Sequence, residues 1–258
     1  MASTTQRKTL RVVNTYEVME GAGVLVKRAL PSSEFSYDDV DPFLLLDFAT
    51  INPDDPGFPD HPHRGFEIVM YVLSGAASHT DSLGNQAEIP AGAAQRITAG
   101  RGMTHGEGFG EDSTEAIRGL QLWINLSKEN KSVEPEYQTL LPHEIPVDRQ
   151  SGLTVKQLVG GNSPMTLRTP TMYLDVTIEE GRHFERRIPQ GFQGFAFVID
   201  GEGLFGEENA RASAGQLVLL GSDESFRAKQ DGAGALNFVL VAGQPHREPV
   251  LWRGPFVD

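Results

Sequence analysis

The sequence predicts an all-β protein built from two similar β-barrels. Helical periodicity is almost absent, and the apolar segments are short and rich in β-branched or aromatic residues. The chain also carries 28 glycines and 16 prolines, which indicates frequent turns. Many short strands at close spacing are typical of sandwiches and barrels.

Each expected strand is a short apolar run bounded by turn residues. The strands are predicted at residues 10–13, 24–30, 43–49, 67–74, 76–80, 95–99, 116–126, 154–159, 172–178, 194–200, 216–220 and 236–242. Between Asp81 and Gln86 the run DSLGNQ favours a hairpin turn, with Gly84 and Asn85 in left-handed conformations. The polar stretch 128–147 contains no clear strand and is interpreted as a crossover between two halves.

The two halves resemble each other in sequence. An apolar strand ends at Gly75 in the first half and at Gly201 in the second, an offset of 201 − 75 = 126 residues. A second turn ends at Gly92 and at Gly215, an offset of 215 − 92 = 123 residues. Two copies of one β-unit explain this spacing. We therefore expect an N-terminal barrel over residues 1–130 and a C-terminal barrel over residues 131–258.

Composition narrows the classes of function. Thirty-five acidic against 22 basic residues give a formal charge of −13, which disfavours direct binding of nucleic acid. The chain has no cysteine, so any metal must be held by nitrogen and oxygen ligands. No apolar run reaches the length of a signal peptide or a membrane span, and a cytoplasmic protein without a membrane contact is expected.

Histidine and carboxylate residues form two closely spaced pairs. His61 and His63 are separated by one proline, and His105 and Glu107 by one glycine. In an extended chain, residues i and i+2 point to the same face, so each pair can direct two donors to one point. Two neighbouring strands would then supply three imidazoles and one carboxylate. This set suits Fe(II), Mn(II), Co(II), Ni(II) or Cu(II) and leaves positions open for substrate or oxygen.

Other polar and aromatic residues have weaker patterns. Arg64 and Arg101 flank the pairs and either orient an anionic substrate or form surface ion pairs. His79 is interpreted as a residue at the rim of a strand. Most inward aromatic side chains of a barrel belong to the core, so only some of the apolar candidates are expected to touch a ligand. These candidates are Phe66, Met103, Phe109, Leu122 and Trp123.

Several motifs resemble those of a known family. HPHRGFE, at residues 61–67, fits the cupin pattern H-x-H-x₃-E, and Pro90-x-Gly92 with His105 resembles the second cupin motif. HPHRGFE, DSLGN, ITAGRGMTHGE and GLQLWINL together resemble the pirin family of bicupins. The resemblance spans most of the chain and is most specific in residues 58–126.

This resemblance implies two stacked cupin barrels with a metal, usually iron, in the N-terminal one only. Carried onto this sequence, the ligands are His61, His63, His105 and Glu107. The general cupin pattern offers Glu67 as a rival carboxylate. Glu107 is favoured, and Glu67 is then a partner of the ligands or a buried polar group of its strand, while Arg64 is a further candidate for contact with the ligands.

The second half of the chain lacks the same donors. Arg187-Ile-Pro189 stands near the place of the first histidine pair, and no histidine lies near Ala228. The C-terminal barrel is therefore expected to be metal-free.

The resemblance further implies a metal-dependent dioxygenase that acts on quercetin or a similar flavonol-like aromatic with O2. One divalent ion is expected, Fe(II) first, with Mn, Co, Ni, Cu or Zn as alternatives. Glu107 would both ligate the metal and accept the proton of a substrate hydroxyl. A monomer is expected.

Two other functions remain open at this stage. In one, the protein is an iron-dependent redox sensor that binds a transcription factor or an enzyme, as described for members of the family. In the other, the metal is a structural element without turnover. A cavity open to a bicyclic ligand would favour the enzyme, and a sealed metal beside a charged surface would favour the sensor.

Overall fold

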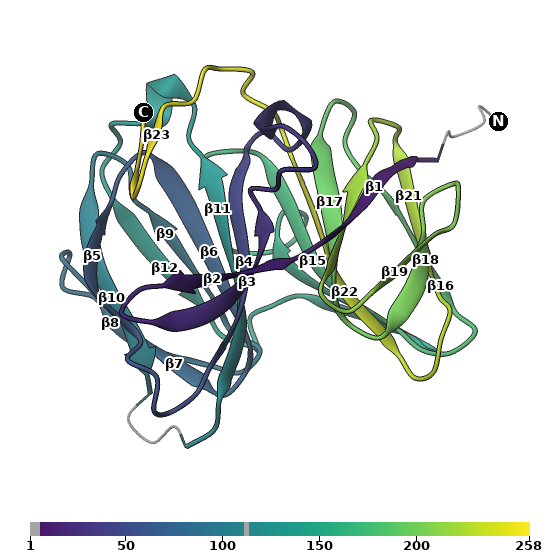
Figure 1. The fold of residues 1–258 in the computed structure, drawn as a ribbon, viewed down its shortest axis with the longest axis horizontal. Coiled ribbons are helices and arrows are strands. Elements are labelled where there is room, and N and C mark those ends of the chain that lie inside the picture. Colours follow the sequence, from purple (N-terminus) through teal and green to yellow (C-terminus); the bar gives the residue numbers. More distant parts are fainter. Residues whose placement is uncertain (1–5, 111–113) are drawn as a thin grey trace.

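Two β-barrels lie side by side in the computed structural model, which describes residues 6–110 and 114–258 (Figure 1). The helical elements among these residues are two single 3-10 turns, Tyr37–Asp39 and Lys128–Asn130. No helix in the described ranges has the length and apolar character needed to cross a membrane. The expectation of an all-β bicupin is confirmed.

The first barrel consists of a seven-stranded and a four-stranded antiparallel sheet. The larger sheet has the order β12-β9-β6-β11-β4-β3-β2, and the smaller one β5-β10-β7-β8. The strands are β2 (Tyr16–Glu20), β3 (Val24–Leu30), β4 (Phe43–Ile51), β5 (Phe58–His63), β6 (Phe66–Ser74), β7 (Ala76–Asp81), β8 (Gln86–Pro90), β9 (Ala94–Thr98), β10 (Met103–Phe109), β11 (Ile117–Asn125) and β12 (Glu136–Leu140).

The second barrel repeats this plan, as the duplicated sequence pattern predicts. Its seven-stranded sheet has the order β1-β20-β17-β22-β15-β14-β13, and its four-stranded sheet β16-β21-β18-β19. The strands are β1 (Thr9–Asn14), β13 (Val147–Gln150), β14 (Leu153–Val159), β15 (Thr171–Ile178), β16 (His183–Arg187), β17 (Gln193–Asp200), β18 (Glu202–Phe205), β19 (Ala210–Ser213), β20 (Gln216–Leu220), β21 (Ser225–Gln230) and β22 (Leu236–Gly243). A short hairpin, β23 (Trp252–Arg253) and β24 (Phe256–Val257), follows.

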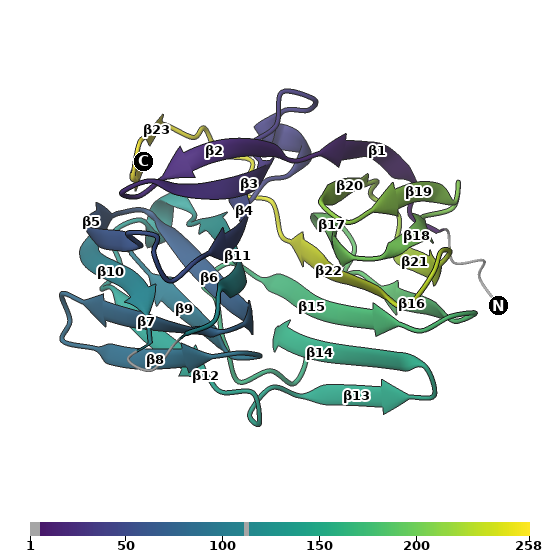
Figure 2. The same ribbon diagram turned by 60° about the horizontal axis from the view of Figure 1, so that its bottom comes forward.

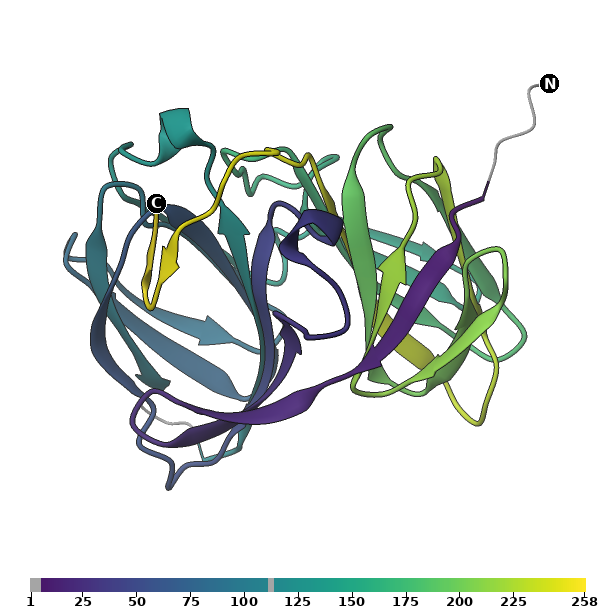
Figure 3. The same cartoon turned by 45° about the horizontal axis from the view of Figure 1, so that its top comes forward.

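Both ends of the chain cross from one barrel to the other. Strand β1 pairs with β20 in the second barrel, and β2 continues directly into the first (Figure 2). The segment after β22 runs back to the first barrel, where β23 and β24 lie over one end of it (Figure 3). The division at residues 130 and 131 remains a prediction, because each barrel receives a strand or hairpin from the other end of the chain.

One expectation about the crossover is wrong. The stretch 128–147 contains strand β12, which pairs with β9 and extends the larger sheet of the first barrel. Only Leu140 of this strand is fully buried, and the other four residues are half-buried. An edge strand of this kind lacks the alternation of apolar and polar residues on which the sequence interpretation depends.

The interiors of the two barrels differ. In the second barrel, Phe184, Phe205, Phe226 and Phe238 pack against one another, with ring centroids 5.4 to 6.4 Å apart. Strands β16 and β21, which pair there as β5 and β10 do in the first barrel, thus contribute phenylalanines to a filled core. The first barrel instead encloses a cavity of about 610 Å³.

A polar network ties the barrels together within a shared apolar core. Tyr71 of β6 donates a hydrogen bond to Asp175 of β15 (2.7 Å), and both contact the Lys156 Nζ (3.0 and 2.9 Å). Asn237 donates to the other carboxylate oxygen of Asp175 (2.7 Å). Because the Asp175 side chain is only 4% exposed, these partners replace the hydrogen bonds that it would otherwise form with water.

Candidate metal centre

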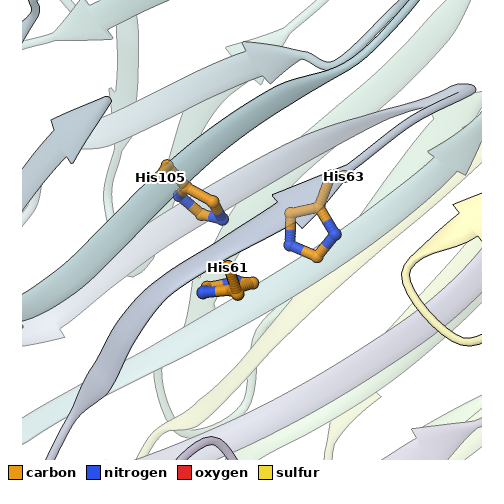
Figure 4. Close-up of side chains that lie close together, drawn as sticks. All are labelled: His61, His63 and His105. Atoms are coloured by element: carbon orange, nitrogen blue, oxygen red, sulfur yellow. The ribbon is translucent and has the colours of Figure 1, made fainter. Parts of the chain in front are cut away.

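Three histidines meet between strands β5 and β10 of the first barrel. The antiparallel register places His61 directly opposite His105, and His63 lies two residues further along β5. The rings converge (Figure 4), with centroids 4.4 Å apart for His61 and His105, 5.0 Å for His63 and His105, and 4.6 Å for His61 and His63. One nitrogen of each ring lies within 4.8 Å of the others, which is close enough for one metal ion.

Glu107 reaches the same region through an irregularity in β10. The register with β5 shifts between His105 and Glu107, as it does at a β-bulge, a feature that often re-aims side chains near active sites. One oxygen of its carboxylate lies within 4.8 Å of a ring nitrogen of His105 and of a ring nitrogen of His79. Gln95 Nε2 donates a hydrogen bond of 2.6 Å to Glu107 Oε1, and the Tyr137 hydroxyl donates to Gln95 Oε1 (3.0 Å).

The electrostatics of the cluster favour metal binding. Burial, together with the neighbouring His61, lowers the pKa of His63 to about 3 and that of His105 to about 2. Both rings are therefore neutral at physiological pH and offer the lone pairs that a metal needs. The ring nitrogens of His105 are buried and have no hydrogen-bond partner in the described part of the chain. Unsatisfied buried nitrogens are costly, and a bound cation would satisfy them.

Glu107 has the opposite shift. Burial raises its pKa to about 7, although the hydrogen bond from Gln95 acts in the other direction. A nearby cation would favour the charged carboxylate and lower this pKa. The donor set of three imidazoles and one carboxylate thus fits a divalent transition ion.

His79 differs from its expected place at a rim. It is 1% exposed, and its ring stacks on Tyr137 with centroids 4.3 Å apart. Its Nε2 lies 3.2 Å from Asp81 Oδ2, and its ring centroid is 5.6 Å from that of His105. Sequence spacing does not reveal this position, because the ring of Tyr137 that covers it comes from the unexpected strand β12.

Glu67 and Arg64, the two residues proposed as partners of the ligands, form hydrogen bonds with other residues instead. Glu67 is fully buried, and its two carboxylate oxygens accept hydrogen bonds from Thr98 Oγ1 (2.7 Å) and the Arg168 amide (2.9 Å). It is absent from both metal-capable groups of the described chain. Arg64 is partly exposed and forms two 2.9 Å hydrogen bonds with Asp258, and Arg101 forms a surface ion pair with Glu134.

The cavity opens onto the cluster. His61, His63 and Glu107 line it together with a largely apolar surface, which includes Leu45, Ile51, Met70, Val72, Ile117 and Trp123. Of the expected apolar candidates, Trp123 lines the cavity, and Phe66 stacks behind it at 4.3 Å. The volume of about 610 Å³ lies within the usual range for small-molecule sites.

Residues 251–258, here called the strap, close one side of the cavity. Trp252, Gly254 and Pro255 contribute to the lining. The strap is held by Arg64, whose amide donates to the Pro255 carbonyl (3.2 Å) and whose carbonyl accepts from the Val257 amide (3.0 Å). The second half of the chain thus contributes directly to the wall of the site in the first barrel.

We predict that Gly65→Ala displaces the strap. Gly65 has φ +88°, and a Cβ built there would lie 1.8 Å from the Val257 carbonyl oxygen. Gly84 has the same φ of +88° but nothing within 4 Å, so Gly84→Ala reports the backbone strain alone. Gly84→Ala is expected to cost about 1 kcal/mol and Gly65→Ala about 2 to 4 kcal/mol of unfolding free energy.

Thermal unfolding and limited trypsin digestion after Arg253 measure the two effects. Faster cleavage in Gly65→Ala than in Gly84→Ala is expected. Equal stability and equal cleavage of the two variants would contradict close packing of the strap against Gly65.

Two family profiles cover most of the chain. The pirin profile matches residues 23–124, and the pirin C-terminal cupin domain profile matches residues 173–258. Over 244 residues the chain is 42% identical to a pirin-like protein of Solanum lycopersicum, covering 92% of this chain and 82% of that one. Over 260 residues it is 39% identical to the pirin of Homo sapiens, covering 98% and 87%.

Solved structures show the same architecture. A quercetin 2,3-dioxygenase from Acinetobacter baumannii is similar with a TM-score of 0.86 and 27% identity, over 98% of this chain and 92% of that chain. Two cupin barrels, a histidine cluster in the first of them and the matching profiles lead to one assignment: the chain belongs to the pirin family.

Proposed function

We propose that this protein is a metal-dependent dioxygenase of flavonol-like aromatic compounds. The observation that carries the proposal is the cavity of about 610 Å³ that His61, His63 and Glu107 line. A metal held there would face a space large enough for a bicyclic substrate. The similarity to a quercetin 2,3-dioxygenase supports the choice of substrate class.

The proposed ligands are His61, His63, His105 and Glu107, with Fe(II) as the expected ion. Glu107 is preferred to Glu67 because both oxygens of Glu67 are already engaged by Thr98 and Arg168. His79 is proposed to support His105 from behind, since Asp81 and the Tyr137 ring hold it in place.

A metal held by these residues would supply Lewis acidity toward a substrate oxygen and the redox chemistry needed for reaction with O2. The residues of this chain do the remaining work. Glu107 Oε1 is fixed by Gln95, so Oε2 is the oxygen proposed to accept the proton of the substrate hydroxyl. The apolar walls exclude water and hold the aromatic rings against Trp123.

The proposal is tested on purified full-length protein. Metal content is measured first, and quercetin is then mixed with the protein without oxygen before oxygen is admitted. We expect about one metal ion per chain, no loss of quercetin without oxygen, and quercetin loss with matching oxygen uptake afterwards. Metal without turnover of any flavonol would instead favour the redox-sensing protein that binds a partner, and absence of metal would contradict both.

A further inference from the structure

The cavity has a second polar region, away from the histidines. Arg28 Nε and Nη2 donate to the two carboxylate oxygens of Asp47 at 2.8 and 2.7 Å, and Nη2 also donates to Glu20 Oε1 at 2.5 Å. The Arg28 and Asp47 side chains are only 13% and 8% exposed. Together with Gln121, these three residues line the cavity, and we call the four the polar wall.

The polar wall stands opposite the metal centre. Arg28, Asp47 and Gln121 belong to β3, β4 and β11 of the larger sheet, whereas the histidines belong to β5 and β10 of the smaller one. Gln121 pairs with Asp47, and two residues along β11 Trp123 pairs with Leu45. The Trp123 ring lies 5.0 Å from that of His63. One same-face step along a strand is about 7 Å, so a flavonol whose fused rings lie at the histidines can place its attached phenyl ring along Trp123 and reach the wall.

The wall has free capacity for hydrogen bonds. Gln121 lines the cavity, and in the described ranges its side-chain amide has no hydrogen-bond partner, so it can both donate to and accept from a ligand. The carboxylates of Glu20 and Asp47 can accept further hydrogen bonds besides those from Arg28. Hydroxyl groups, which both donate and accept, complement such a surface.

Besides its hydrogen bonds, the charge of the polar wall also selects among substrates. Burial raises the pKa of Asp47, while its bidentate contact with Arg28 acts in the other direction. With both carboxylates ionised, the wall carries one net negative charge, which the apolar cavity screens less than open water does. An anionic substituent at this end would be repelled by the carboxylates. Arg28 could not offset the repulsion, because it is already paired with Asp47 and Glu20. Neutral phenols escape this penalty.

We propose that the polar wall determines substrate specificity: it binds the hydroxyl groups on the remote ring of a neutral phenolic substrate and rejects substrates with an anionic group there. The proposal rests on the proposed function for its substrate class. It concerns binding, however, and is measured without turnover.

The experiment is a binding titration without oxygen, followed by the quenching of tryptophan fluorescence, because Trp123 lines the cavity. The probes are quercetin, galangin, which lacks the hydroxyls of the remote ring, and quercetin-5′-sulfonic acid. Wild-type protein is expected to bind quercetin about tenfold more tightly than galangin and at least about tenfold more tightly than the sulfonate.

The variants separate the two criteria. Gln121→Leu is expected to bring the quercetin and galangin affinities within about threefold of each other. Glu20→Gln and Asp47→Asn are each expected to reduce the ratio of quercetin affinity to sulfonate affinity by about tenfold. Glu17→Gln, an exposed position on the same strand as Glu20, makes the same chemical change outside the cavity and should alter none of the ratios.

Three results would overturn the proposal: no binding of any probe, equal wild-type affinity for quercetin and galangin, or variant ratios that match those of Glu17→Gln. Turnover is assayed separately on the metal-loaded protein. Selective binding without turnover would contradict the proposed dioxygenase activity and support the role of the polar wall in specificity. Turnover with unselective binding would support the dioxygenase activity and contradict that role.

Discussion

His63→Ala is expected to reduce bound metal to trace amounts and to lower oxygen-dependent loss of quercetin at least about a hundredfold. Even a group that only orients a ligand contributes roughly 10- to 100-fold to metal affinity or activity, so loss of a ligand should cost more. His63 is the proposed ligand that lies between the Trp123 ring and the His105 ring, with centroids 5.0 Å from each. Metal analysis and the quercetin assay measure both effects.

The matched control is His183→Ala. His183 begins β16, the strand that pairs with β21 in the second barrel, and its side chain is exposed. This variant should keep its metal and its turnover. If His63→Ala retained one ion per chain with wild-type turnover, the site would have to lie elsewhere. Thermal unfolding shows whether either variant is destabilised.

Asp175→Ala is expected to lower the free energy of unfolding by about 3 to 5 kcal/mol, because the buried Asp175 carboxylate accepts hydrogen bonds from three side chains, and each donor left without its acceptor costs about 1 to 3 kcal/mol. The fully buried Tyr71 hydroxyl would lose its acceptor at the interface between the barrels, and Lys156 would keep only its contact with that hydroxyl. For a chain of this size the melting temperature should fall by roughly 6 to 20 °C. Calorimetry or circular dichroism measures the change.

A second aspartate nearby provides the control. Asp200 pairs with Arg118 at 3.3 Å, but the two side chains are 59% and 37% exposed. Exposed pairs contribute little, so Asp200→Ala should cost less than about 1 kcal/mol. Similar losses in the two variants would mean that the Asp175 network does not hold the barrels together.

The sequence predicts local features of the site well. The i, i+2 spacing places His61 and His63 on one face of a strand, and the structure brings both to His105. The glycine-bounded strands likewise depend on residues close together in the chain, and their repetition at an offset of about 125 residues predicts two barrels. Whether the cluster binds metal stays a prediction until it is measured.

Features that depend on distant segments are not predictable in this way. The polar wall combines residues from β2, β3, β4 and β11, and no spacing connects Glu20 with Gln121. The burial of His79 depends on Tyr137, which lies 137 − 79 = 58 residues away on a strand without clear alternation. The partner of Arg64 is Asp258, 194 residues away.

The crossed ends of the chain bear on how the protein folds and melts. Thr9 pairs with Leu220, a separation of 220 − 9 = 211 residues, and Arg64 bridges Phe256, a separation of 256 − 64 = 192 residues. Closing such long loops costs chain entropy before any contact repays it, and a high contact order slows folding. Neither barrel can complete its edges until the other half of the chain is present, so the halves should gain and lose structure cooperatively, as a single kinetic unit.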